Sequence, residues 1–224
     1  MREQIMQDAE MLFRPFDRPE DAARQSRRTR AFRHPVFSWL GLRPIFAQHT
    51  QAEHDALLRW GAGRRSVVEI GVAEGASACA LRKVMSPQGD LCLIDPFHLT
   101  RLRQMNSTKR AAHAAVKRFG TSHVRWIEQF SSEAVRNWNS QIDLLFIDGD
   151  HREEAVLQDW ANWSPFVVLA GVAIFHDARL FAGGWPKPED GPVRAVNRLF
   201  RNAPVKGWRI VDELDSLVVV KRLE

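Results

Sequence analysis

Residues 67–75, VVEIGVAEG, constrain the fold more than any other stretch of the sequence. Val67, Val68 and Ile70 are β-branched, which favours a strand buried on both faces, as in a parallel sheet covered by helices. Small residues follow, and the segment after Gly75 has the composition of a helix. The stretch therefore predicts a strand, a tight turn and a helix, with the turn at the strand's carboxyl end, where open α/β sheets bind ligands.

The alternation of strands and helices continues along the chain. Apolar runs typical of strands occur at 91–97, 142–151 and 167–178, and helical patterns occur at 131–139 and 152–166. Strands that alternate with helices imply right-handed crossovers and a mostly parallel sheet. We therefore predict an α/β fold with helices on both faces of the sheet.

The end of the chain departs from this pattern. Two short β-like runs, Arg209–Val211 and Leu217–Val220, are joined by a predicted turn over residues 212–215. So short a connection allows only a hairpin. The hairpin would add an antiparallel C-terminal strand to the sheet.

The first part of the chain is interrupted by prolines, which end helices. We expect residues 1–49 to form a helical or irregular extension and residues 50–224 to form one domain. Segment 50–61 opens this domain with Thr50 as a capping residue and Glu53 at the third helical position. That spacing predicts a helix that begins with a capping box.

Composition restricts the class of protein. The chain is 45% hydrophobic and 26% charged, as in ordinary globular proteins. We find no apolar run that could span a membrane, and acidic residues near the N-terminus argue against a secretion signal. We therefore expect a cytoplasmic protein in which Cys79 and Cys92 are buried free thiols.

The net charge of +5 is concentrated in an arginine-rich segment, ARQSRRTRAFR at 23–33. Such a segment can bind nucleic acid, an anionic membrane surface or an acidic partner. Asp17, Glu20 and Asp21 precede it, and this mixed charge favours a solvated helix face or an oligomer contact. We expect a homo-oligomer and do not expect a nucleic acid partner.

Three predicted strands end close to an acid: Glu69, Asp95 and Asp148. An acid roughly twenty residues past a glycine-rich turn, as Asp95 is, can accept hydrogen bonds from ribose hydroxyls. The turn reads G-x-A-x-G and not the G-x-G-x-x-G of dinucleotide sites, and Glu69 and Glu74 beside it would repel a pyrophosphate. S-adenosylmethionine, a cation with a ribose and no phosphate, suits this turn better.

Four strings carry a family resemblance: EIGVAEGAS, LIDPF, DLLFIDGDHREEAVLQDW and GVAIFHDA. In this order they resemble the class I S-adenosylmethionine-dependent methyltransferases, within them the group with macrolide-sugar O-methyltransferases and cephalosporin-hydroxylase-like proteins. More distantly they resemble catechol O-methyltransferase. The resemblance covers residues 50–222 and implies a Rossmann-like fold that binds S-adenosylmethionine.

The resemblance also implies roles for individual residues. Asp95 matches the ribose-binding acid, and Ser131 and Ser132 fall where such enzymes contact the adenine edge. Ala73 stands where many relatives have a glycine, so its methyl group narrows the approach of the cofactor. The implied cofactor-binding residues are Glu69, Gly71, Ala73, Gly75, Asp95, Ser131, Ser132 and Asp148.

The segment FIDGDH supplies the predicted catalytic residues, Asp148 and His151. An imidazole titrates near neutral pH, so we predict His151 as the general base, the alternative being a cap of the following helix. Asp148 and Asp177, with Asp150, could hold Mg²⁺ or a similar divalent cation. Ala178, however, follows Asp177 where metal-dependent relatives carry another ligand.

Two features near the end of the last parallel strand concern the acceptor side of the site. We expect His176 to be held by hydrogen bonds at the strand end rather than to bind a metal. Residues 181–200 are rich in glycine and proline and predict a loop over the site, where Trp185 can cover the acceptor. An ordinary surface loop is the alternative.

The sequence therefore predicts an enzyme, an S-adenosylmethionine-dependent methyltransferase. We expect O-methylation of a small-molecule hydroxyl, on a sugar or a phenolic metabolite, with assistance from a metal ion left open. One alternative is a non-catalytic binding or scaffold protein with the same cofactor fold. Another is an RNA methyltransferase that uses the arginine-rich segment 24–33.

Overall fold

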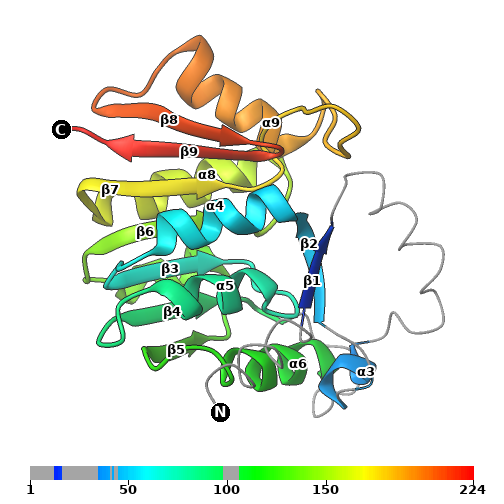
Figure 1. The fold of residues 1–224 in the computed structure, drawn as a ribbon. Helices are drawn as coiled ribbons and strands as arrows, with labels where there is room; N and C mark the ends of the chain where they lie inside the picture. Colours follow the sequence, from blue (N-terminus) through cyan, green and yellow to red (C-terminus); the bar gives the residue numbers. More distant parts are fainter. Residues whose placement is uncertain (1–12, 17–34, 41, 43–44, 98–105) are drawn as a thin grey trace.

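A seven-stranded sheet forms the centre of the protein, with the strand order β5-β4-β3-β6-β7-β9-β8 (Figure 1). The computed structural model describes residues 13–16, 35–40, 42, 45–97 and 106–224. The parallel strands are β3 (Ser66–Ile70), β4 (Asp90–Ile94), β5 (His123–Ile127), β6 (Ile142–Ile147) and β7 (Val167–Phe175). The predicted α/β fold with a mostly parallel sheet is confirmed.

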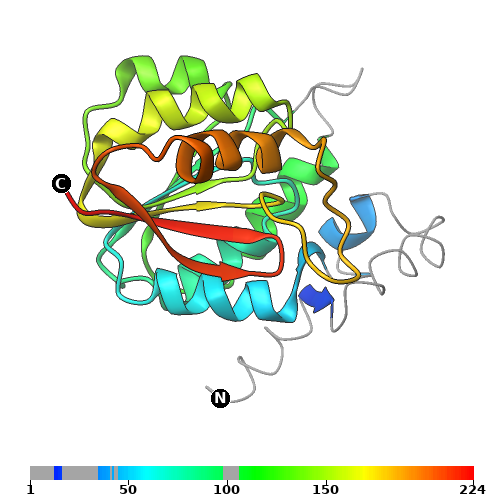
Figure 2. The same cartoon turned by 90° about the horizontal axis from the view of Figure 1, so that it is seen from above.

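Helices cover both faces of the sheet (Figure 2). One layer contains α4 (Gln51–Gly61), α5 (Ala76–Val84) and α6 (Ser107–Val116). The other contains α7 (Ser131–Ala134), α8 (Glu153–Trp163) and α9 (Gly191–Val196), together with the short turns Val135–Asn137, Ser164–Phe166 and Asn197–Asn202. Every parallel crossover therefore returns over a face of the sheet, as the sequence predicts.

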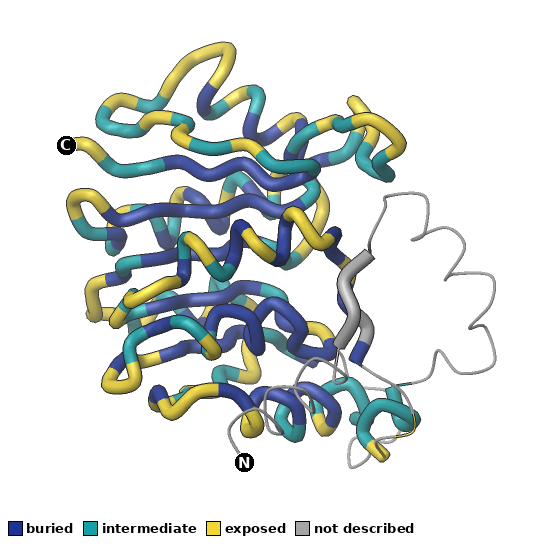
Figure 3. Tube along the Cα trace, viewed as in Figure 1, coloured by how far each residue is buried: buried dark blue, intermediate teal, exposed yellow. Residues whose placement is uncertain are grey.

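Alternation along the central strands divides the apolar core between these two layers. Val67 packs in the cluster with α4, α5 and α6, whereas its neighbour Val68 packs in the cluster with α8 and α9. The central strands are buried along most of their length (Figure 3). Cys79 and Cys92 lie in these cores as buried free thiols, which confirms that prediction.

The C-terminal hairpin is tighter than the sequence predicts. β8 (Trp208–Leu214) and β9 (Leu217–Arg222) are both longer than expected, and only Asp215 and Ser216 lie between them. The predicted turn over 212–215 is therefore wrong, because the first three of these residues pair with β9. β9 lies antiparallel between β7 and β8, which confirms the antiparallel C-terminal strand.

The described part of the N-terminal extension contains strands as well as a helix. β1 (Phe13–Phe16) pairs in parallel with β2 (Ile45–Thr50), and α3 (Val36–Trp39) lies between them in sequence. The strand pair was not predicted. β2 leads directly into α4. The arginine-rich segment 23–33 lies outside the described residues. Among the residues described, no helix has both the length and the apolar character needed to cross a membrane.

The capping box of α4 is present and serves more than the helix. Thr50 Oγ1 accepts from Glu53 N, and Glu53 Oε2 accepts from Thr50 N at 2.8 Å. Glu53 is fully buried, and its Oε1 accepts from the backbone N and the hydroxyl of Ser216 at 2.8 and 2.6 Å. Its Oε2 lies 3.6 Å from His176 Nε2 at the end of β7. One carboxylate thus joins the start of α4, the hairpin turn and the last parallel strand.

We predict that Glu53→Ala lowers the free energy of unfolding by about 3 kcal/mol, because it leaves buried donors of Thr50, Ser216 and His176 without their acceptor. Urea denaturation measures this loss. The matched control is Asp55→Ala, on the exposed face of the same helix, which should change stability by no more than about 0.5 kcal/mol. Equal unfolding midpoints for the two variants would contradict the structural role of Glu53.

Candidate cofactor and active site

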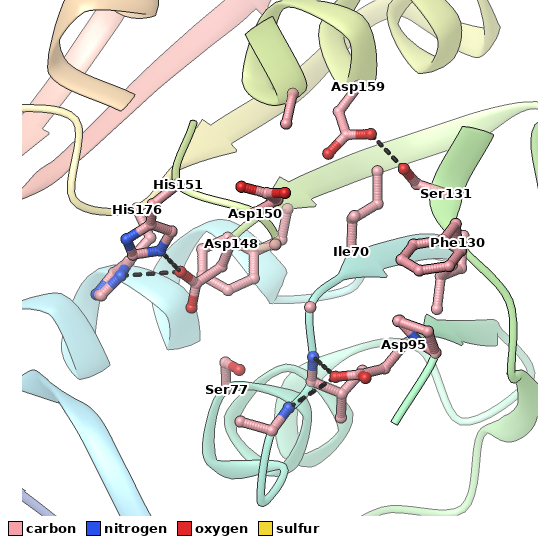
Figure 4. A pocket seen from close by; sticks show the side chains of 18 of the residues that line it. Ile70, Ser77, Asp95, Phe130, Ser131, Asp148, Asp150, His151, Asp159 and His176 are labelled. Atoms are coloured by element: carbon pink, nitrogen blue, oxygen red, sulfur yellow. Dashed lines mark hydrogen bonds and ion pairs between the residues drawn. The ribbon is translucent and has the colours of Figure 1, made fainter. Parts of the chain in front are cut away.

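A cavity of about 480 Å³ opens at the carboxyl ends of β3, β4 and β6 (Figure 4). That volume suits a small-molecule ligand. The loops after these strands form its floor, and its two ends carry different side chains: Asp95, Phe130, Ser131 and Asp159 at one, Asp148, His151 and His176 at the other.

Asp95 is held rigidly at the end of β4. Its Oδ2 accepts from the backbone N of Val72 at 2.9 Å and of Ala73 at 3.1 Å, and its Oδ1 accepts from Phe97 N at 2.7 Å. The carboxylate therefore fixes the loop after β3 while lining the cavity. A ribose that binds here would meet an acceptor whose orientation is already set.

The small residues of the loop after β3 serve contacts within the chain itself. A Cβ at Gly71, whose φ is +85°, would lie 2.0 Å from the carbonyl oxygen of Asp148. A Cβ at Gly75 would lie 3.3 Å from Ala112 of α6, and Gly75 does not line the cavity. Gly71 and Ala73 do line it, and Ala73 keeps a φ of +47° despite its side chain.

Glu69 is not presented to the cavity, although the sequence places it beside the turn. It is fully buried, does not line the cavity, and its Oε1 accepts from Ser77 Oγ at 2.5 Å. Burial raises its pKa well above the usual range, which disfavours the charged form. Ser77, its hydrogen-bond donor, does line the cavity, and a role of Glu69 in binding the cofactor stays a prediction.

Ser131 and Ser132 line the cavity at its other end, as the resemblance implies for the adenine side. Ser131 Oγ donates to Asp159 Oδ1. Asp159 also lines the cavity, and sequence reasoning missed it. The sequence did contain an indication of this position. Asp159 has the helical spacing of the buried residues Val156 and Trp160 in α8, and an acid is unusual on such an apolar face.

The opposite end of the cavity brings acids and imidazoles together. Asp148 Oδ1 lies 3.5 Å from His151 Nε2 and 3.2 Å from His176 Nδ1. Asp177 lies beside the same rings, with Oδ1 3.3 Å from His176 Nδ1 and Oδ2 3.7 Å from His151 Nδ1. His151 and Asp148 line the cavity, whereas Asp177 does not. The predicted catalytic pair is thus brought together at one site.

The charges at this end set the protonation of the two rings. Burial alone would raise the pKa of Asp148, but His176 and His151 overcome it and hold that pKa well below its usual range. Contact with Asp148 raises the pKa of His151 against the opposing effect of burial. Burial would lower the pKa of His176, yet Asp148 and Asp177 raise it well above the usual range. The buried His176 ring thus lies close to three carboxylates, those of Asp148, Asp177 and Glu53, and they favour its charged form.

His151 does not cap the following helix. The N-cap of α8 is Arg152, and Asp150 Oδ1 accepts from the backbone N of Arg152 at 2.9 Å. The alternative interpretation of His151 as a helix cap is therefore wrong. About half of the His151 side chain is exposed, so it is accessible to a ligand in the cavity.

Each of the acids predicted to hold a metal is paired with a nitrogen group of another side chain. Asp150 is bound by the Arg152 guanidinium, with Nη2 2.6 Å from Oδ2. Asp177 Oδ1 accepts from Trp185 Nε1 at 2.6 Å, and Asp148 faces the two imidazoles. Within the described residues no group of three or more acidic, histidine or cysteine side chains has the arrangement of a metal site. Mg²⁺ prefers a shell of oxygen ligands, and here the carboxylate oxygens face a guanidinium, an indole and imidazoles instead, so the donor set does not fit Mg²⁺.

Trp185 contacts Asp177 from the segment that connects β7 to α9. Besides its bond to Asp177, its ring lies edge-on to Phe181, with 5.4 Å between ring centroids. Trp185 does not line the cavity itself. That Trp185 covers an acceptor therefore stays a prediction.

Comparison with known proteins agrees with this architecture. Residues 68–178 match the family described as a methyltransferase domain. A protein from Corynebacterium glutamicum is 16% identical, with a TM-score of 0.62 over 93% of this chain and 92% of that one. An O-methyltransferase from Bacillus cereus, solved with S-adenosylhomocysteine, is 13% identical, with a TM-score of 0.57 over 91% and 97%. A methyltransferase from Geobacter sulfurreducens is 17% identical, with a TM-score of 0.52 over 94% and 98%.

At these identities the solved structures show a shared fold. The match to the methyltransferase domain runs from β3 to β7, so both comparisons agree with the class I S-adenosylmethionine-dependent methyltransferases that the sequence resembles. The resemblance seen in the sequence is confirmed at this level.

We predict that Gly71→Ala lowers the free energy of unfolding by about 3 kcal/mol or more, because the added Cβ collides with the Asp148 carbonyl and the positive φ disfavours a side chain. Gly63→Ala is the matched control. Gly63 has a φ of +70° but nothing within 4 Å of an added Cβ, so it should lose only about 1 kcal/mol. Equal losses in urea denaturation would mean that the close approach to Asp148 carries no cost.

Proposed function

We propose that the protein transfers the methyl group of S-adenosylmethionine to a hydroxyl oxygen of a small molecule. The observation that carries the proposal is the position of His151: a half-exposed imidazole lines the cavity at the opposite end from Asp95 and Ser131. A cofactor with its ribose on Asp95 and its methionine part over Gly71 would direct its sulfonium toward His151.

When bound, S-adenosylmethionine supplies a methyl group on a sulfonium whose leaving thioether is neutral. The protein's residues orient the partners and remove a proton. In our proposal neutral His151 takes the hydroxyl proton of the acceptor as the new oxygen–carbon bond forms and the carbon–sulfur bond breaks. Asp148 stabilises the imidazolium that results, since its Oδ1 lies 3.5 Å from His151 Nε2.

Metal assistance forms no part of this proposal. The acids that were predicted as ligands are bound to Arg152, Trp185 and the two imidazoles, so their oxygens do not offer a shared cation site. The base that we propose acts without an ion.

A small-molecule acceptor is favoured over RNA for a similar reason of geometry. The cavity is a bounded pocket of about 480 Å³, a volume that suits a small-molecule ligand. A scaffold protein without catalysis would not need a base beside the cofactor cavity. A cytoplasmic location and a homo-oligomeric state stay predictions from the sequence.

We predict that His151→Ala lowers kcat by a factor of about 100 or more while the affinity for S-adenosylhomocysteine stays within about threefold. The wild-type rate should rise with pH through a pKa above 6.5, because the base must be neutral and contact with Asp148 raises its pKa. Transfer of a labelled methyl group to a panel of hydroxylated acceptors measures the rate, and calorimetry measures the affinity.

The matched control is His123→Ala, an exposed histidine of β5 outside the cavity, which should leave both quantities unchanged. Wild-type turnover should also persist in EDTA, which reports separately on the absence of a metal requirement. Full activity of His151→Ala would remove the base from the mechanism and leave the cofactor site intact.

A further inference from the structure

Asp159 occupies an unusual position in the wall of the cavity. It lies near the middle of α8, and only 5% of it is exposed to solvent. Its neighbours in the buried stripe of the helix are Val156, Trp160 and Trp163, all apolar. Core-facing helix positions normally hold apolar residues, and an acid there requires polar partners.

The described residues give Asp159 one such partner. Ser131 Oγ donates to Oδ1, and no other hydrogen bond to the carboxylate is formed within the described part of the chain. Burial raises the pKa of Asp159 to about 6, helped by the nearby charge of Asp150. The carboxylate is therefore poorly stabilised when the cavity holds no ligand, and a further donor would favour its charged form.

The second oxygen, Oδ2, lies on the side of the cavity floor. Asp159 lines the cavity together with Gly149 and Phe130. Oδ2 is 3.7 Å from the point that a Cβ of Gly149 would occupy, and Ile70 Cγ2 lies 3.2 Å from the same point, so a side chain here would crowd the carboxylate. Figure 4 shows the Asp159–Ser131 pair above Ile70, with the ring of Phe130 at the same end. A flat ligand next to Phe130 would thus bring its edge toward Oδ2.

We propose that Asp159 selects the base of the cofactor, with Oδ2 accepting a hydrogen bond from the exocyclic amino group of adenine. In this arrangement Ser131 is a positioning residue that holds Asp159 through Oδ1, and Phe130 contacts the ring. The inference rests on the proposed binding of S-adenosylmethionine with its ribose at Asp95, because the base then extends away from His151 toward α8.

The chemistry of a carboxylate makes this selection specific. A carboxylate only accepts hydrogen bonds, so it pairs with the amino group at position 6 of adenine. Hypoxanthine carries a carbonyl oxygen at that position, which would face Asp159 Oδ2 with its lone pairs. A site built on a buried acceptor rejects such an analogue because the buried group is left without its donor.

The test uses two probes that differ at this position, S-adenosylhomocysteine and S-inosylhomocysteine, with calorimetry on the full chain. The wild type should bind the adenine probe roughly tenfold or more tightly than the hypoxanthine probe. Asp159→Asn should weaken the adenine probe roughly tenfold and reduce the preference to about threefold or less, because an amide can also donate to the carbonyl. Ser131→Ala should give a smaller loss for the adenine probe and keep the preference.

The matched control is Glu154→Gln, which removes an exposed carboxylate from the same helix and should leave both affinities unchanged. The ratio of the two affinities within one variant does not depend on the fraction of folded protein. A less stable variant therefore still measures the preference for the adenine probe. An unchanged preference in Asp159→Asn would overturn the assignment of Asp159 alone. Failure of the wild type to bind the adenine probe would overturn the proposed function as well.

Discussion

The close approach of two loops, those after β3 and β6, is the constraint on which the site depends. Gly71 fits against the Asp148 carbonyl only because it has no Cβ. Backbone bonds tie the same loops to the sheet, since Gly71 N donates to Ile94 O and Asp148 N donates to Ile70 O, each at 2.9 Å. The loops after β3 and β6 therefore keep a fixed relative position. In our proposal this fixed position helps to align the methyl donor with the acceptor.

The acids around this edge show how environment assigns different roles to one functional group. The pKa of Glu69, which is buried beneath the loop, is raised well above its usual range by that burial. Asp148 stays ionised because two imidazoles face it. Asp95 receives backbone amides, and Asp159 has only a serine hydroxyl. The carboxylates that act on a ligand in our account, those of Asp95, Asp148 and Asp159, all line the cavity, whereas that of Glu69 does not.

Much of the fold could be predicted because it follows from local chemistry. The capping box of Thr50 and Glu53 needs only residues three positions apart, and strand composition revealed β3, β4, β6 and β7. Features that depend on packing were missed. The sequence does not show that Glu69 is enclosed, that Asp159 faces the cavity, or that Asp212 continues β8 and shortens the turn. Each depends on contacts between segments far apart in the chain.

A crystal structure of the protein with S-adenosylhomocysteine tests the central claim most directly. Our account predicts density in the cavity beside Gly71, with both ribose hydroxyls on the Asp95 carboxylate and the sulfur on the side of His151. A ligand bound elsewhere, or one whose sulfur end lies against Phe130 and Ser131, would contradict it.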